Sequence, residues 1–174
     1  MAEGAERDGF ACVLRELSMA DAATASEVRD VGRRAYAVEA GLIGFAGIPA
    51  LRESLEEMRA QPLRWLGAVT GSGRVAAFVA WREPGEGTDG EAVVDVHRVC
   101  VDPPWFRRGL ASRLLRHLLD ELAPAHDVAV STGARNHPAV ALYRRLGFVR
   151  VGGFEPVPGV PVSRFRLTRR SATD

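Results

Sequence analysis

The fold is decided by residues 99–116, which read V-C-V-D-P-P-W-F-R-R-G-L-A-S-R-L-L-R. The apolar run that ends at Val101 predicts a β-strand, and two prolines end that strand because proline cannot donate to a sheet ladder. A helix with leucines at steps of three and four then begins beside Gly109. A strand that passes through a turn into a helix predicts a sheet with a helix packed on its face.

The start of this helix has the composition of an anion-binding site. Glycine and alanine at positions 109 and 111 let a ligand approach the backbone, and the unpaired amides of a first helical turn point outward along the positive end of the helix dipole. Arg107 and Arg108 add two guanidinium groups that suit phosphate oxygens. A core helix with a solvated basic cap has the same composition, so this turn alone leaves both interpretations open.

The rest of the chain alternates between strand and helix patterns. Strand patterns occupy residues 10–17, 64–70, 75–82, 91–101, 128–132, 148–154 and 163–168. Helix patterns run from Ser18 to a glycine-rich segment at residues 41–47, from Pro49 to Pro62, and over residues 110–122 and 136–146. A proline-rich loop, residues 156–161, separates the last two strands. The order βααβββαβαββ predicts a single mixed α/β domain.

Composition restricts the classes of protein. The 174 residues match the size of one domain, and 23 basic against 22 acidic side chains give a net charge of +1. None of the basic residues is a lysine, which excludes a P-loop nucleotidase, a Schiff-base enzyme and a protein kinase. A net charge near zero argues against a nucleic acid as partner.

The cysteines and the apolar runs indicate where the protein is located and whether it binds a membrane. Cys12 and Cys100 are too few for a zinc site and lie in apolar strand patterns, so we expect buried reduced thiols, no metal and a cytoplasmic location. The longest apolar run, residues 75–81, is far shorter than the roughly 20 residues that span a bilayer. Residues 1–4 lack the features of a signal peptide. We therefore expect no membrane partner.

Two motifs in the C-terminal half resemble those of the GCN5-related N-acetyltransferases (GNAT). In that family the fourth strand leads into a pyrophosphate-binding loop of the form Q/R-x-x-G-x-G/A, which reads F-R-R-G-L-A at residues 106–111. Phe106 stands where Gln or Arg is usual. The second motif is Asn136 at the start of a helix, followed by A-V-A-L-Y-R-R-L-G-F at residues 139–148. The resemblance is specific over about residues 93–151.

The resemblance implies the GNAT fold, an α/β (α+β) architecture with a mixed central sheet of about seven strands, four helices, and strands four and five splayed apart. It implies one domain over residues 10–170, between a flexible arm of residues 1–9 and a tail of residues 171–174. Acetyl-CoA would bind as co-substrate where the two strands part. The cofactor-binding residues it implies are Val99, Cys100, Val101, Phe106, Arg107, Arg108, Gly109, Leu110, Ala111, Ser112, Asn136 and Tyr143.

The resemblance also implies roles for these residues. The backbone amides of Val99 and Val101 would polarise the thioester carbonyl, as donors aimed at a developing oxyanion do. Tyr143 would protonate the leaving thiolate, although a core aromatic would fit the same position. Asn136 caps its helix and, in the family, also binds the pantetheine amides.

An attacking amine needs a route for its proton, because an alkyl ammonium with a pKa near 10 costs about 4 kcal/mol to deprotonate at pH 7. Family members carry a carboxylate or histidine at the positions of Asp95 and His97, which strict alternation places on one strand face with Glu91 and Val99. Glu39, near the end of the first long helix, is the third candidate. A salt bridge from Asp95 to an arginine, with a structural His97, is the alternative.

The sequence therefore predicts an acetyl-CoA-dependent N-acetyltransferase that acts on a primary amine of a small molecule or peptide by direct attack. A non-catalytic acyl-CoA-binding regulatory module is the alternative, with Phe106 as the sign of an altered cofactor loop. Apolar residues within 41–47 and 156–161 predict a partly hydrophobic entrance for the acceptor. Family members often form dimers, which leaves a homodimer open.

Overall fold

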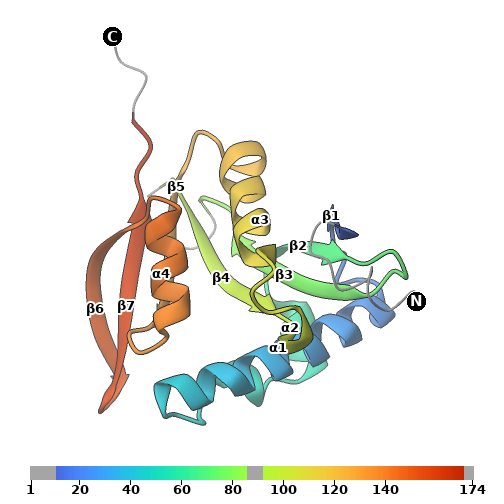
Figure 1. Ribbon diagram of the computed structural model, residues 1–174, viewed down its shortest axis with the longest axis horizontal. Helices are drawn as coiled ribbons and strands as arrows, with labels where there is room; N and C mark the ends of the chain where they lie inside the picture. The colour runs from blue at the N-terminus through green and yellow to red at the C-terminus, as the bar shows by residue number, and fades with distance from the viewer. Residues whose placement is uncertain (1–10, 86–91, 171–174) are drawn as a thin grey trace.

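One sheet of seven strands organises the protein. The computed structural model describes residues 11–85 and 92–170, and its strands lie in the order β1-β2-β3-β4-β5-β7-β6. Figure 1 shows β1 at one edge and the β6–β7 hairpin at the other. Among the described strands, β4 and β5 alone are parallel neighbours, so the sheet is mixed, as predicted. The strands are β1 (Val13–Glu16), β2 (Arg64–Val69), β3 (Val75–Arg82), β4 (Val93–Val101), β5 (Asp127–Gly133), β6 (Val149–Val157) and β7 (Val160–Leu167).

In the described part of the chain, four α-helices connect these strands in the predicted order. They are α1 (Ala22–Ile43), α2 (Leu55–Ala60), α3 (Leu110–His117) and α4 (His137–Arg145). Local side chains determine where they begin: the Asp21 carboxylate accepts a hydrogen bond from the Thr24 amide at 3.1 Å, and Asn136 caps α4 in the same way. Gly44, with φ +68°, ends α1 in the left-handed conformation that favours glycine.

The sheet separates two hydrophobic clusters. On one face, α1 and α2 bury side chains such as Val28 and Met58 against Trp65 and Phe78. On the other face, α3 and α4 bury a second set against β2, β3, β4 and β5. The largest members of this second set are Trp81, Tyr143, Phe148 and Phe165, and four leucines of the α3 segment join them: Leu110, Leu114, Leu115 and Leu118. Both cysteines are buried and free of disulfide bonds, as expected.

Three elements differ from their predictions. The helix expected after Pro49 is split into a 3-10 turn (Pro49–Leu51) and α2, because Ser54 starts a new helix with a capping box to Glu57. The helix expected over residues 110–122 changes after His117 into a π-helical turn (Leu118–Leu122). The expected loop at residues 156–161 is a tight turn between Val157 and Val160, because Gly159 adopts φ +80° and lets β6 and β7 pair almost to their ends.

The predicted splay between strands four and five is confirmed. β4 and β5 pair only from Val93 and Asp127 to Val96 and Val130. β4 then continues beside β3 alone. At the same point β4 carries a bulge: Trp81 pairs with Val96 and Ala80 with Arg98, so His97 has no partner on β3.

This bulge corrects the expectation that Asp95, His97 and Val99 share a strand face. One extra residue reverses the alternation of the side chains that follow it. Val99 therefore packs with Val96 toward α3 and α4, whereas Cys100 packs toward α1 and α2. Glu91, assigned to the same face, lies outside the described residues, as do the expected arm (1–9) and tail (171–174). Within the described residues, no helix has both the length and the apolar composition to cross a membrane.

Candidate active site

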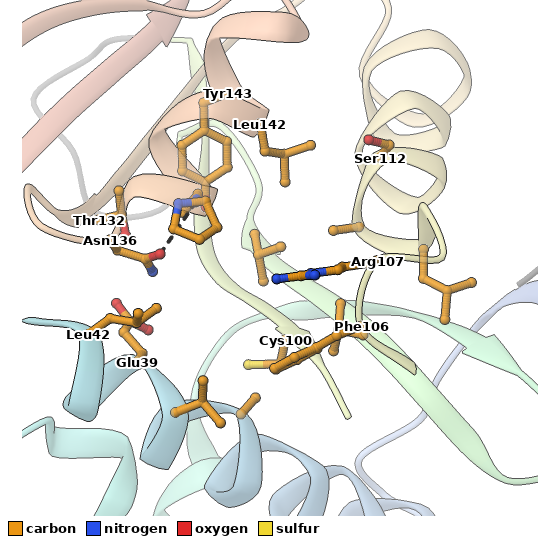
Figure 2. Close-up of a pocket in the computed structure, with 18 of the residues that line it drawn as sticks. Glu39, Leu42, Cys100, Phe106, Arg107, Ser112, Thr132, Asn136, Leu142 and Tyr143 are labelled. Carbon is orange, nitrogen blue, oxygen red and sulfur yellow. Dashed lines mark hydrogen bonds between the residues drawn. The ribbon is translucent and has the colours of Figure 1, made fainter. Parts of the chain in front are cut away.

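A cleft of about 530 Å³ lies where β4 and β5 part. Its walls come from α1, the open half of β4, the loop and first turn of α3, the end of β5 and one face of α4 (Figure 2). The volume lies in the range of small-molecule sites. The cleft brings together nearly all residues singled out from the sequence, namely Glu39, His97, Val99, Cys100, Val101, Phe106, Arg107, Arg108, Gly109, Leu110, Ala111, Ser112, Asn136 and Tyr143.

Two backbone amides of β4 face this cleft. The Asp102 amide donates to the Ala76 carbonyl, on the β3 side, at 2.9 Å. Because successive amides of a strand point to alternate sides, those of Val101 and Val99 point away from β3. On that side β5 has already diverged, since its last pair with β4 is Val96–Val130. The two amides are thus hydrogen-bond donors without a neighbouring strand in the described part of the chain.

The loop before α3 has the backbone of an anion-binding site. Arg107 adopts φ +61° and Gly109 φ +75°, which turns the chain so that the first amides of α3 point outward. Figure 2 shows the guanidinium of Arg107 directed into the cleft. The Arg108 guanidinium lies over the Trp105 ring, 5.9 Å from its centroid, which restrains it beside the same loop. Two guanidinium groups and a helix start therefore lie together at this loop.

α4 contributes Asn136 and Tyr143 to the opposite wall. The Asn136 Oδ1 atom accepts a hydrogen bond from the Ala139 amide at 3.3 Å, so the cap also orients the side-chain amide. The Tyr143 ring lies 5.9 Å from Phe148 and 5.8 Å from Phe165, and the residue is 4% exposed. Burial raises the pKa of Tyr143 well above its ordinary value, and the nearby Glu39 carboxylate raises it further. The phenol is thus a neutral donor, and Tyr143 is both a core aromatic and a cleft residue.

Glu39 faces Asn136 from α1 (Figure 2). Burial raises the pKa of the Glu39 carboxyl, and a hydrogen bond from Asn136 lowers it in part. Because Asn136 Oδ1 accepts from the Ala139 amide, its NH₂ group is the part of the side chain that can donate to Glu39. Glu39 is therefore a partly desolvated carboxylate at the cleft surface.

Asp95, predicted together with His97 as a candidate base, is not among the described residues that line the cleft. Its Oδ2 atom lies 3.2 Å from His97 Nε2, and His97 rather than Asp95 lines the cleft. Asp95 lies where β4 is still paired on both sides, opposite Arg82 on β3 and Ala129 on β5. Asp95 is thus separated from the cleft by His97.

Cys100 lies at the base of the cleft but is a poor nucleophile. Burial raises the pKa of its thiol to about 12, although a hydrogen bond from Tyr36 opposes that rise. A thiol with this pKa is protonated near neutral pH, which fits direct attack by an amine better than an acyl-cysteine intermediate. No cluster of three metal-ligating side chains occurs within residues 11–85 and 92–170.

The structure adds cleft residues that the sequence analysis missed and leaves out one expected segment. Thr132 follows the last β4–β5 pair, where the strand pattern turns polar, and Arg145 and Tyr36 reach the cleft from α4 and α1. The polar end of the strand was a usable signal for Thr132, whereas Arg145 and Tyr36 had none. The turn within residues 156–161, expected beside the acceptor, supplies none of the lining residues in the described part of the chain.

The splay of β4 and β5 beside the start of α3 is the feature that relates this fold to a known family. A family model described as "Acetyltransferase (GNAT) family" matches residues 39–148. The chain belongs to this family.

Curated relatives share parts of this sequence. The chain is 30% identical over 147 residues (84% of the chain, 41% of the relative) to the UPF0157 protein YqkA of Bacillus subtilis. It is 45% identical over 86 residues (45% and 26%) to the mycothiol acetyltransferase of Thermobifida fusca. It is 47% identical over 58 residues (33% and 36%) to the N-alpha-acetyltransferase RimI of Mycobacterium tuberculosis. The matched regions thus span less than half of each of these three relatives.

Solved structures share the fold over nearly their whole length. The ribosomal-protein-S18-alanine N-acetyltransferase of Escherichia coli superposes with a TM-score of 0.68 at 19% identity, over 94% of this chain and 99% of that one. The PaiA N-acetyltransferase of Thermoplasma acidophilum in complex with coenzyme A gives 0.65 at 13%, over 88% and 97%. Identities this low establish the fold alone.

Proposed function

We propose that this protein is an N-acetyltransferase that uses acetyl-CoA and transfers the acetyl group to a primary amine by direct attack. The observation that carries the proposal is the fork between β4 and β5, which lines one cleft with free backbone amides, two arginines and a buried tyrosine. Reactions of this type require a donor for the carbonyl oxygen, a binding site for phosphate and a donor for the leaving thiolate. Each requirement has a candidate in the cleft.

Coenzyme A fits the chemistry of this cleft. Its pyrophosphate would bind the outward amides at the start of α3, with Arg107 and Arg108 beside them. When bound, acetyl-CoA supplies an activated acyl group as a thioester. Phe106, 40% exposed at the same loop, offers the carrier an apolar contact in place of the polar one usual in the family.

The chain's own groups would act on the two ends of the reacting bond. The amides of Val99 and Val101 would hydrogen-bond the carbonyl oxygen as it gains negative charge, with no reorganisation of the backbone. Tyr143 would donate to the sulfur as it becomes a thiolate, and its raised pKa keeps that O–H donor protonated. Glu39, and His97 with Asp95 behind it, are the candidates for taking the amine's proton.

The relatives support an amine acceptor but differ in its type. Two of them are named for mycothiol and for an N-alpha amine, so both a small molecule and a peptide amino terminus are open to this protein. The buried reduced cysteines fit a reducing compartment such as the cytoplasm.

The proposal is tested by thiol release from acetyl-CoA with a panel of primary amines. We expect turnover that depends on the amine, with acetylated amine as product. Tight binding of acetyl-CoA without turnover of any amine would favour the alternative, a non-catalytic acyl-CoA-binding module.

Replacing Tyr143 by phenylalanine separates its catalytic role from its packing role. We expect Y143F to lower kcat about tenfold or more, because the donor to the thiolate is lost, with little change in acetyl-CoA affinity. The phenyl ring keeps the contacts with Phe148 and Phe165, so the melting temperature serves as the folding control. An unchanged kcat would remove Tyr143 from the mechanism.

A further inference from the structure

The charges along the cleft are unevenly distributed. Arg107, Arg108 and Arg145 bring guanidinium groups to it, and His97 lies on its β4 wall. Glu39 is the one carboxylate that lines it in the described part of the chain. A cationic acceptor therefore has one anionic partner available, on α1.

The Glu39 carboxylate faces a polar neighbour that does not neutralise it. Its partner, Asn136, is a neutral amide whose orientation is set by the α4 cap, because Asn136 Oδ1 accepts from the Ala139 amide. No ion pair among the described residues includes Glu39. A second N–H of the Asn136 amide remains for a ligand, so the two residues need not compete. A partly desolvated carboxylate without a cation is stabilised when an ammonium group binds beside it.

The surroundings of Glu39 on α1 are apolar. Val38 and Leu42 line the cleft on either side of it and are 39% and 47% exposed, unusually open for large apolar side chains. Val28 and Val31, earlier in the same helical stripe, are buried in the core. The end of α1 thus presents one carboxylate framed by hydrophobic surface.

We propose that Glu39 binds the ammonium group of the acceptor and accepts the proton that must leave before attack, and that the preferred acceptor is a primary amine on an apolar body with no carboxylate beside the nitrogen. This inference rests on the proposed function and specifies the acceptor half of the same cleft. Amines on apolar side chains and peptide amino termini both satisfy it, whereas free amino acids do not. Their carboxylate would approach Glu39 with like charge.

The proton and the bonds balance in this scheme. The ammonium gives one proton to the Glu39 carboxylate, and the neutral nitrogen forms the new C–N bond as the C–S bond breaks. The nitrogen then loses its second proton to solvent, while the thiolate takes the phenol proton of Tyr143 and solvent returns one proton to the phenolate. Glu39 releases its proton to solvent and is ionised again.

Other ionisable groups face Glu39 and its neighbours. Tyr36 and Cys100 lie at the base of the cleft and stay protonated, because burial raises the pKa of both. Tyr143 and Arg145 lie on α4, Arg107 and Arg108 at the α3 loop, and His97 on β4 with Asp95 behind it. Among these, His97 is the competing proton acceptor.

The test uses Glu39→Gln, which removes the charge but keeps an oxygen that can accept from Asn136. The matched control is Asp30→Asn, the same change of group at an exposed position of α1 that does not line the cleft. Binding of phenethylamine to the protein saturated with coenzyme A is measured by calorimetry at pH 7. We expect E39Q to bind it about tenfold or more weakly, and D30N within about twofold of the wild type. Equal affinity for coenzyme A in all three proteins shows that the cleft is intact.

Three amines that share one apolar body test the specificity. Wild type should prefer phenethylamine and phenylalanine amide over phenylalanine by about tenfold or more in kcat/KM, and E39Q should reduce that ratio to within about threefold. The kcat/KM of the wild type should fall at acidic pH, because acid protonates Glu39. This acidic limb of the pH profile should be absent in E39Q. A short peptide amide with N-terminal alanine distinguishes the source of the amine, and E39Q should weaken its binding equally.

Two failures are distinguishable. Binding of phenethylamine that weakens in E39Q, without turnover by the wild type, would refute the proposed function and keep the ammonium site. Turnover by wild type with E39Q equal to it in affinity, amine preference and pH profile would overturn the inference. If His97→Ala alone then removed the acidic limb, the proton acceptor would be His97.

Discussion

The two halves of β4 differ in what they pair with. From Val93 to Val96 the strand pairs with β5, and Asp95 and Val96 pair with β3 as well. Val94 and Val96 are 0% and 4% exposed. After the bulge at His97, residues Arg98 to Val101 pair with β3 alone, and the outward amides of Val99 and Val101 face the cleft. Backbone groups that are paired contribute to stability, whereas donors left open are available to a ligand.

The carboxylates beside the two halves differ in the same way. Asp127, at the start of β5, accepts hydrogen bonds from the Arg169 amide at 2.7 Å and from Arg166 at 2.9 Å. Glu39, beside the open half, has a neutral amide as partner. The carboxylate beside the paired half, Asp127, is thus paired with an arginine. The carboxylate beside the open half, Glu39, has no cation beside it and is available to a substrate. The difference indicates that this fold separates stability from chemistry along a single strand.

Removing core volume beside the paired half of β4 should lower the stability more than any other change. Leu114 on α3 is 0% exposed and packs in the cluster of Val94 and Val96. Leu114→Ala should lower the free energy of unfolding by about 2–5 kcal/mol, because it removes buried methyl groups and leaves a cavity. Urea unfolding measures this loss. Arg116→Ala, on the exposed side of α3, should change it by less than about 0.5 kcal/mol, and an equal loss in both variants would contradict the prediction.

A side chain at Gly109 should strain the backbone of the loop before α3, beside the open half of β4. No atom lies within 4 Å of a Cβ placed there, but φ is +75°. Gly109→Ala should cost about 1–2 kcal/mol of stability and weaken coenzyme A binding, because a Cβ in this conformation meets the following carbonyl oxygen. Thermal unfolding and a coenzyme A titration measure the two effects. Gly71→Ala, in a loop that has equal space and no positive φ, should leave coenzyme A affinity unchanged, and the comparison fails if the two variants behave alike.

Neutralising Asp127 should remove a smaller stabilisation that depends on pH. Hydrogen bonds from the Arg169 amide and Arg166 lower the pKa of Asp127 below its ordinary value of 3.8. The stabilisation is therefore complete above that value and lost as the pH falls through the pKa of the folded state. Asp127→Asn should cost about 1 kcal/mol at pH 7 and progressively less in acid, as followed by unfolding across pH. The exposed Asp120→Asn serves as control, and a cost for D127N that does not vary with pH would argue against charge pairing.

Neutralising Glu39 should change the stability least of the four variants, and it should raise the stability where the other three lower it. Burial raises the pKa of Glu39 above its ordinary value of 4.5, so the ionised carboxylate destabilises the fold above the folded-state pKa and has no such effect below 4.5. Glu39→Gln should therefore stabilise the protein by about 0.5 kcal/mol at pH 7, and the difference should vanish in acid. Melting temperatures at pH 7 and pH 4 test this. A less stable E39Q at pH 7 would mean that the carboxylate is satisfied after all.

Periodicity was sufficient for the order of the elements, because each helix or strand displays its own pattern of apolar residues. The two motifs were sufficient for most of the cleft, because the residues at the start of α3 and along α4 are close in sequence. The bulge at His97 has no such signal: residues 93–101 alternate well enough to suggest a regular strand. The pairing with β3 places the extra residue, and it moved Val99 to the other face.

The apolar residues along one face of α1 show a second feature that the sequence pattern could not predict. Val28, Val31, Val38 and Leu42 follow one helical period, yet the first two are buried in the core and the last two border the cleft. The difference depends on how far the sheet extends beneath the helix. A helical period reports one face of the helix and does not identify what covers that face.

The sequence by itself determined the element order, the glycine and the arginine pair before α3, and the residues of the two motifs, because these depend on local propensity and short spacing. Only the tertiary structure decided that β5 leaves β4 after Val96, that Asp95 stands behind His97, and that Glu39 meets Asn136. These depend on contacts between segments far apart in the chain, and they are determined by the packing of the whole sheet.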